Sequence, residues 1–381
     1  MMPDRVAVDL GDGKVVYSFE GIQKQAEANA RRAIEAMNTA LKKPDRDRTV
    51  GGRAEAWYRS LRSSVDAGRI SVPRWGAYQR NLDVFTAWVG PNTPIDALTA
   101  VKLEEYYAHL SGFVGSGRYA PAYTRSLFAA AQQFIAWNSE LGLIPPPGNL
   151  RSRKFRFSKS RPQGLSRADL FTPGEFRTLL AAAGERLRLF LLLMANCGMY
   201  QSDVSDLGED EVDWQARTVT RSRSKTGAQV VTYKLWPETF ELLVKCRHEG
   251  SPVLNARGSR RVLVTGDGRP LCNYWIEDGK ERRYDTVNSL YSGLKTLTGV
   301  KKPLKNIRKT SASELVKHST YKFYAQYFLA HAPDNVADAS YIVPADEEFF
   351  EALHWLRERL LALPPTPPEE DGKRRTDRSG R

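Results

Sequence analysis

Apolar residues recur at steps of three and four over residues 50–143, which is the period of one face of an α-helix. The clearest series lies in the second of four such stretches and comprises Trp75, Tyr78, Leu82, Phe85 and Val89. Aromatic side chains at helical spacing are far more often core residues than a base-stacking platform. The pattern therefore predicts a bundle of four helices over 50–143, clustered by its aromatic residues.

Residues 169–362 mix helical and strand-like patterns. Thr172-Pro173-Gly174-Glu175 has the form of a helix N-cap, with proline in the first turn and glutamate at the third helical position. Val212 to Val219 and Val230 to Leu235 are rich in β-forming residues and flank a hairpin with a basic tip. The helix that begins at this cap is predicted to end near residue 182. Further helical patterns cover 185–197, 237–248, 284–298, 305–318, 320–330 and 346–362. The predicted fold class is mainly α with minor β (α+β), a helical domain followed by a mixed one.

Three other segments complete the predicted organisation. Residues 1–44 contain two apolar runs around Gly11-Asp12-Gly13 and then a helical pattern, which predicts a small ββα-like unit. Residues 144–168 begin with a proline-rich helix stop and continue as a basic linker. Residues 363–381 combine prolines with mixed charge and predict a disordered tail.

Composition narrows the classes of function. A chain of 381 residues is expected to form two or three domains, and its net charge of +13 is typical of proteins with a polyanionic partner, most often nucleic acid. No stretch approaches the ~18 apolar residues that cross a bilayer, and charge rather than an apolar signal core follows the first residues. The three cysteines lack CxxC spacing, which favours thiols of a reducing cytoplasm over disulfides or a zinc site.

The candidate chemistry is a tyrosine preceded by cations. Lys225 stands in Ser-Lys-Thr-Gly, Lys305 and Arg308 begin and end Lys-Asn-Ile-Arg, and His331 and Tyr341 follow, with no metal-ligand cluster near them. A tyrosine hydroxyl is a weak nucleophile at neutral pH and needs positive charge and hydrogen-bond donors around the phosphate that it attacks. This combination favours attack of a tyrosine on a phosphodiester.

The order and spacing of these motifs resemble the tyrosine recombinase/integrase family over roughly residues 50–362. The resemblance implies a helical core-binding domain and a mixed catalytic domain that clamp duplex DNA. It implies that Tyr341 attacks the scissile phosphate and leaves a 3′-phosphotyrosyl link and a free 5′-hydroxyl, with no metal or nucleotide cofactor. It further implies a cytoplasmic, nucleoid-associated protein without membrane partners, monomeric in solution, which self-associates on DNA into a tetrameric synapse.

The same resemblance gives each motif residue a role. Arg308 would hold two non-bridging phosphate oxygens, and Lys305, which replaces the family histidine, would donate to the same phosphate. Lys225 would protonate the departing 5′-oxygen, and His331 would donate to a non-bridging oxygen. Asp203 matches the acid that supports the family's first arginine. Three nearby tyrosines are expected to be packing residues instead: Tyr321, Tyr324 and Tyr327.

The chain departs from the family at one position. Where the first arginine is expected, in a Gly-Leu-Arg-type turn, Tyr200 follows Gly198-Met199 and precedes Gln201. Loss of one preorganised donor typically costs ~10²–10³ in rate. Three explanations are open: another cation such as Arg221 or Arg223 fills the site, Tyr200 or Gln201 donates neutral hydrogen bonds, or the protein binds DNA without cutting it efficiently.

Basic residues of the linker and of the hairpin tip are predicted to contact DNA phosphates. They are Arg151, Arg153, Lys154, Arg156, Lys159, Arg161, Arg221 and Arg223. The predicted function is that of a site-specific recombinase or integrase. The alternatives are a catalytically weakened DNA-binding protein with the same fold, and a type IB topoisomerase-like enzyme. The unit at 1–44 faintly resembles the arm-site-binding domains of some integrases.

Overall fold

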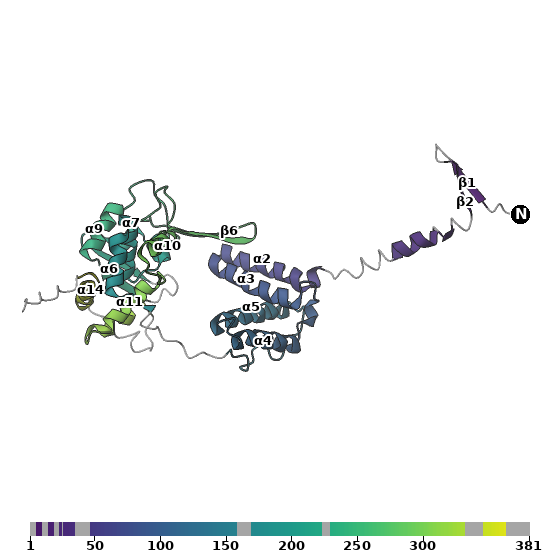
Figure 1. Ribbon diagram of the computed structural model, residues 1–381, viewed down its shortest axis with the longest axis horizontal. Helices are drawn as coiled ribbons and strands as arrows, with labels where there is room; N and C mark the ends of the chain where they lie inside the picture. Colours follow the sequence, from purple (N-terminus) through teal and green to yellow (C-terminus); the bar gives the residue numbers. More distant parts are fainter. Residues whose placement is uncertain are drawn as a thin grey trace, which may run out of the picture. The chain divides into compact units, whose positions relative to one another are not determined.

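The computed structural model describes residues 5–9, 14–18, 23–24, 26–34, 46–157, 169–222, 229–331 and 346–362 (Figure 1). Helices predominate, and the strands within these ranges form small antiparallel sheets. This confirms the predicted class, mainly α with minor β. The chain divides into two compact units, one of residues 1–162 with 276–281 and one of residues 163–275 with 282–381, and each unit has its own hydrophobic core.

The start of the chain contains the expected hairpin. Strand β1 (Arg5–Asp9) pairs antiparallel with β2 (Lys14–Ser18), with Ala7 opposite Val16. Residues 26–34 are helical, as their pattern predicted.

Four long helices form the bundle that follows. They are α2 (Val50–Asp66), α3 (Val72–Val89), α4 (Ala100–Gly115) and α5 (Pro121–Glu140), with short 3-10 turns η1 (Arg46–Arg48) and η2 (Ile95–Ala97). Threonine hydroxyls cap two of them: Thr49 accepts from the Gly52 N–H and Thr99 from the Lys102 N–H. Phe85 and Tyr106 are fully buried and meet edge to face with ring centroids 4.8 Å apart. The aromatic stripes are therefore core, as their spacing predicted.

The second unit combines helices with short strands. Its elements up to the first sheet are α6 (Pro173–Ala182), α7 (Glu185–Asn196), α8 (Gln201–Asp206), η4 (Glu209–Glu211), β3 (Val212–Asp213), β4 (Thr218–Ser222) and β5 (Val230–Lys234). The later elements are α9 (Pro237–Cys246), β6 (Cys272–Glu277), β7 (Lys280–Asp285), α10 (Thr286–Thr298), α11 (Asn306–Leu315), η5 (Tyr321–Tyr324), α12 (Ala325–Phe328) and α14 (Asp346–Leu361). Strands β3, β4 and β5 form one antiparallel sheet in that order. The predicted cap of α6 is confirmed as a reciprocal capping box between Thr172 and Glu175.

Helix α7 runs through the core of this unit. Every side chain from Leu189 to Asn196 is buried, so this part of the helix has no solvent-facing stripe. It packs against α9 and α11 and lies among α6, α9 and α10 in Figure 1. Because the last two turns of α7 are buried, the turn at its C-terminal end is held within the core, and that turn borders the candidate site.

One hairpin was absent from the sequence prediction. Strands β6 and β7 enclose Asp278-Gly279, where both residues have positive φ. An Asp-Gly pair between strand-like runs is a strong hairpin signal, and residues 272–277 show the matching alternation of partly buried and exposed positions. Among the residues that the structure describes, no helix has the length and apolar character needed to span a bilayer.

Candidate active site

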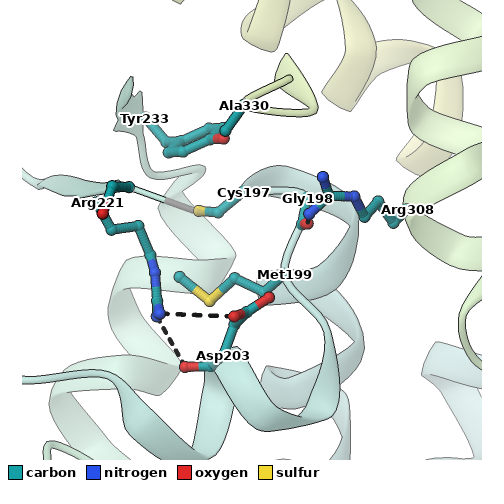
Figure 2. A pocket seen from close by; sticks show the side chains of 9 residues that line it. Cys197, Gly198, Met199, Asp203, Arg221, Tyr233, Arg308 and Ala330 are labelled. Carbon is teal, nitrogen blue, oxygen red and sulfur yellow. Dashed lines mark hydrogen bonds and ion pairs between the residues drawn. The ribbon is translucent and has the colours of Figure 1, made fainter. Parts of the chain in front are cut away.

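A pocket lies at the C-terminal end of α7, where the chain turns sharply (Figure 2). Gly198 has a left-handed φ of 59°, and a Cβ built there would lie 3.0 Å from the Phe328 carbonyl oxygen. The turn thus brings the end of α7 against Phe328, the last residue of α12. The pocket is lined by Cys197, Gly198, Met199, Asp203, Arg221, Ser222, Tyr233, Arg308 and Ala330.

Arg308 enters this pocket from the first turn of α11 and is only 5% exposed. Its guanidinium donates to the carbonyl oxygens of Gly198 and Leu329, which lie at the ends of α7 and α12. The guanidinium carbon also lies 4.7 Å from the centroid of the Tyr200 ring. Arg308 therefore links the C-terminal ends of α7 and α12 and keeps a fixed positive charge in the pocket.

Asp203 and Arg221 form the opposite side of the pocket, both only 7% exposed (Figure 2). The Asp203 carboxylate accepts from the Tyr200 backbone N–H at 2.8 Å and lies 3.7 Å from Arg221 Nη2. Arg221 Nη1 donates to the Asp203 carbonyl oxygen at 2.7 Å, and its Nε lies 3.7 Å from Glu211 Oε1. The charge of Arg221 is thus balanced by two buried carboxylates.

The position of Arg221 differs from the one expected at the basic hairpin tip. Arg221 lies within β4, where Val219 and Arg221 point inward and Thr220 points outward. Side chains two residues apart share one face of a strand, so Arg221 follows Val219 into the core. Its guanidinium therefore lines the pocket, where it is almost fully buried.

The pKa values of two neutral side chains in the pocket, Cys197 and Tyr233, respond to burial and to the nearby arginines. Burial raises the pKa of the Cys197 thiol, while the charge of Arg221 acts to lower it. Burial likewise raises the pKa of the Tyr233 hydroxyl, which donates to the Phe328 carbonyl oxygen at 2.9 Å, and Arg308 and Arg221 oppose that rise. Both groups stay neutral at pH 7, so the guanidinium groups are the positive charges along this lining.

Two other predicted residues lie near the pocket but outside its lining. Lys305 is exposed at the start of α11, three residues before Arg308. His331 directly follows the lining residue Ala330, and its Nδ1 lies 2.7 Å from Gln326 Oε1. An amide oxygen only accepts, so the Nδ1–H of His331 donates in this hydrogen bond.

The neighbouring tyrosines are packing residues, as expected. Tyr324 donates to Glu348, and burial together with that hydrogen bond raises the pKa of its hydroxyl to about 12. The Tyr327 ring meets Phe349 edge to face, with centroids 4.9 Å apart. Tyr321 stacks on His318 at 4.1 Å.

Several predicted residues lie outside the described ranges: Lys159, Arg161, Arg223, Lys225 and Tyr341. Their assignments remain predictions. Two lining residues do lie close to such gaps in the sequence: Ser222 is the last described residue before 223–228, and Ala330 is one residue before His331, the last described residue before 332–345. Of the linker cations, Arg151, Arg153, Lys154 and Arg156 are described and exposed, as phosphate contacts require.

Two residues of the site were not singled out from the sequence. Glu211 is buried beside Arg221 and also forms a 2.8 Å ion pair with Arg257. Tyr233 supplies the hydroxyl that fixes the Phe328 carbonyl. Neither carries a motif, although the alternation of β5 places Tyr233 on the same inward face as Val231.

Comparison with known proteins gives a result for the fold. No family model matches the chain, and no curated protein sequence matches it significantly. Solved structures do match. A lambda integrase dimer bound to a COC′ core site has a TM-score of 0.53 at 16% identity, over 90% of this chain and 95% of that one. A lambda integrase tetramer bound to a Holliday junction has a TM-score of 0.52 at 17% identity, over 88% and 97%. The chain therefore has the tyrosine recombinase fold.

Proposed function

We propose that this protein is a site-specific DNA recombinase or integrase that cuts and rejoins duplex DNA through a 3′-phosphotyrosyl intermediate. The observation that carries the proposal is the placement of Arg308. The tyrosine recombinase fold buries this guanidinium in a pocket with Asp203, between Lys305 and His331 along the chain. A buried, always-charged planar donor suits a phosphate, whose oxygens match its paired N–H groups.

In the proposed reaction the Tyr341 oxygen attacks the scissile phosphorus, and the bond from phosphorus to the 5′-oxygen breaks. The phenolic proton passes to solvent, and the Lys225 ammonium gives a proton to the departing 5′-oxygen. Arg308, Lys305 and His331 donate to the non-bridging oxygens, where negative charge grows in the transition state. Attack by a 5′-hydroxyl on the phosphotyrosine reverses these steps and rejoins DNA.

The proposed partners are duplex DNA and further copies of this chain. The similar lambda integrase structures are a dimer on a core site and a tetramer on a Holliday junction. The exposed linker cations Arg151, Arg153, Lys154 and Arg156 would contact phosphates without reading bases. We propose that four protomers assemble on two DNA sites, and that the segment 1–44 contacts separate arm sites.

One observation favours a second candidate function, a DNA-binding protein that no longer cuts. Tyr200 stands where the family arginine is expected, and its ring lies over the Arg308 guanidinium. In that case the same clamp would hold DNA as an architectural or regulatory factor.

A covalent-capture experiment tests the proposal. The full chain is incubated with a pool of duplexes of randomised sequence, each carrying a nick, so that cleavage close to the nick releases a short strand and traps the protein. DNA that remains attached to the protein after denaturation is recovered and sequenced, and the residue that carries it is mapped by mass spectrometry. We expect attachment at Tyr341 and none with Tyr341→Phe, which keeps the ring but lacks the nucleophile.

The alternatives give different results. Retained binding to the pool without any adduct would overturn the recombinase proposal in favour of the DNA-binding protein. An adduct at another tyrosine would overturn the role of Tyr341. Relaxation of supercoiled plasmids that lack the recovered sequence would indicate the topoisomerase-like enzyme.

A further inference from the structure

We propose that Arg221 supplies the phosphate-stabilising charge that Tyr200 cannot, acting as a second catalytic cation beside Arg308. This inference rests on the proposed function and names one more residue of the same site. Arg221 lies 21 residues after Tyr200 in the chain, on a different element, yet it lines the same pocket as Arg308.

The first argument is the placement of the side chain. Arg221 and Arg308 are each at least nine-tenths buried, and both border the turn from Cys197 to Met199 (Figure 2). Arg221 comes from β4 and Arg308 from α11, two separate elements of the same unit. Two guanidinium groups on one small lining, with Asp203 beside one of them, give the pocket fixed cationic donors from two elements, which is what a phosphorane with growing charge requires.

The second argument is the orientation of Asp203. This carboxylate caps the Tyr200 N–H as the third residue of α8, and it also faces Arg221. In the family the matching acid supports the first arginine. In this chain the guanidinium beside the Asp203 carboxylate is that of Arg221 in β4. The acid therefore again faces an arginine, but that arginine stands at a different position in the sequence.

The third argument is the hydrogen-bonding capacity of Arg221. Among the described residues, its contact at normal hydrogen-bond length is the 2.7 Å one to the Asp203 carbonyl oxygen. The carboxylates of Asp203 and Glu211 are 3.7 Å away, beyond hydrogen-bond range. Glu211 is held more closely by Arg257, at 2.8 Å. A guanidinium has five N–H donors, so Arg221 retains donors for phosphate oxygens.

Stability alone explains this arginine poorly. Buried ion pairs can often be replaced by apolar side chains without loss of stability, because desolvation offsets their attraction. The neighbouring inward position of the same strand is Val219, which fills its place with a simple apolar side chain. We therefore infer that the arginine at position 221 has a functional role that depends on its positive charge.

The test compares cleavage rates on two forms of the captured duplex. One carries the normal scissile phosphate, and the other a methylphosphonate, which has lost the negative charge that Arg221 would neutralise. We expect Arg221→Ala to form the Tyr341 adduct about 10²–10³-fold more slowly on the phosphate, with nearly unchanged DNA affinity. On methylphosphonate the loss should shrink to less than about tenfold, because no full charge remains to be stabilised.

Two further variants separate charge from structure. Arg257→Ala removes the exposed partner of Glu211 and should cleave like the native protein. Adding Tyr200→Arg to Arg221→Ala returns a guanidinium to the pocket and should recover much of the rate. If Arg221→Ala does not fold, Arg221→Lys keeps the charge facing Asp203 but loses the planar fork, and should still cleave at least about tenfold more slowly.

The outcomes are distinct. An equal loss on both substrates, matched by Arg257→Ala, would show that Arg221 is a structural ion pair and overturn the inference. Native cleavage rates in Arg221→Ala or Arg221→Lys would overturn it as well, while leaving the proposed function intact. Absence of any adduct from the native protein would overturn both.

Discussion

Replacement of Gly198 by alanine should weaken the unit that carries the pocket, for two separable reasons. The residue has a φ of 59°, a left-handed conformation that costs an L-residue roughly 1–2 kcal/mol. The added Cβ would also lie 3.0 Å from the Phe328 carbonyl oxygen and 3.2 Å from its ring. That oxygen is fixed by the Tyr233 hydroxyl at 2.9 Å, and the Phe328 ring is fully buried, so neither can move away freely.

The magnitude follows from these two terms. Overpacking of a fixed core contact costs about 1–3 kcal/mol, which gives a total of about 2–5 kcal/mol for Gly198→Ala. Gly258→Ala is a matched control, because Gly258 has a φ of 81° and nothing within 4 Å of a built Cβ. The control should lose only the backbone term, about 1–2 kcal/mol.

Native-state hydrogen exchange on the amides of α7 measures the effect within this unit. The free energies of opening for Leu189 to Ala195 should fall by about 1–3 kcal/mol more in Gly198→Ala than in Gly258→Ala. Because the Gly198 carbonyl accepts from Arg308, the first variant should also lose adduct formation beyond what its stability explains. Equal losses of stability in the two variants would refute the steric part of this reasoning.

Two further predictions concern pH and salt. The hydrogen bond and charge of Arg357 lower the pKa of Glu238, a contact between α14 and α9. A carboxylate with a lowered folded-state pKa contributes stability above its unfolded-state pKa and loses it as pH falls through the folded-state pKa. Arg357→Met should therefore cost on the order of 0.5 kcal/mol at pH 7 and almost nothing near pH ~2 in urea titrations, and a pH-independent cost would contradict this. DNA affinity should fall about 10³-fold between about 50 and about 200 mM salt if about six phosphates are neutralised, as measured by fluorescence anisotropy, whereas a flat response would exclude the linker cations as phosphate contacts.

Local sequence patterns were sufficient for most of the secondary structure. The aromatic stripe of α3, the capping box of Thr172 and the helical character of α7 all depend on neighbours within a few residues. Such signals are encoded by helical periodicity and by caps, which act over one or two turns of chain. The tyrosine recombinase fold was also foreseen, from the order of short motifs, and the structural matches support it. The β6–β7 hairpin was missed, although its Asp278-Gly279 turn was visible in the sequence.

The site depended on contacts that no local pattern encodes. Arg308 binds the carbonyl of a residue 110 positions earlier, and Arg221 meets Asp203 across 18 positions. From the sequence, Arg221 belonged equally to an exposed basic tip and to a filled pocket, because a strand presents alternate faces and only its packing decides which face is buried. Tertiary packing made that decision when it buried Val219 in the core and set Arg221 against Asp203 of α8. The sequence alone determined which helices, strands and charges the chain contains, whereas long-range packing determined which of those charges share one pocket.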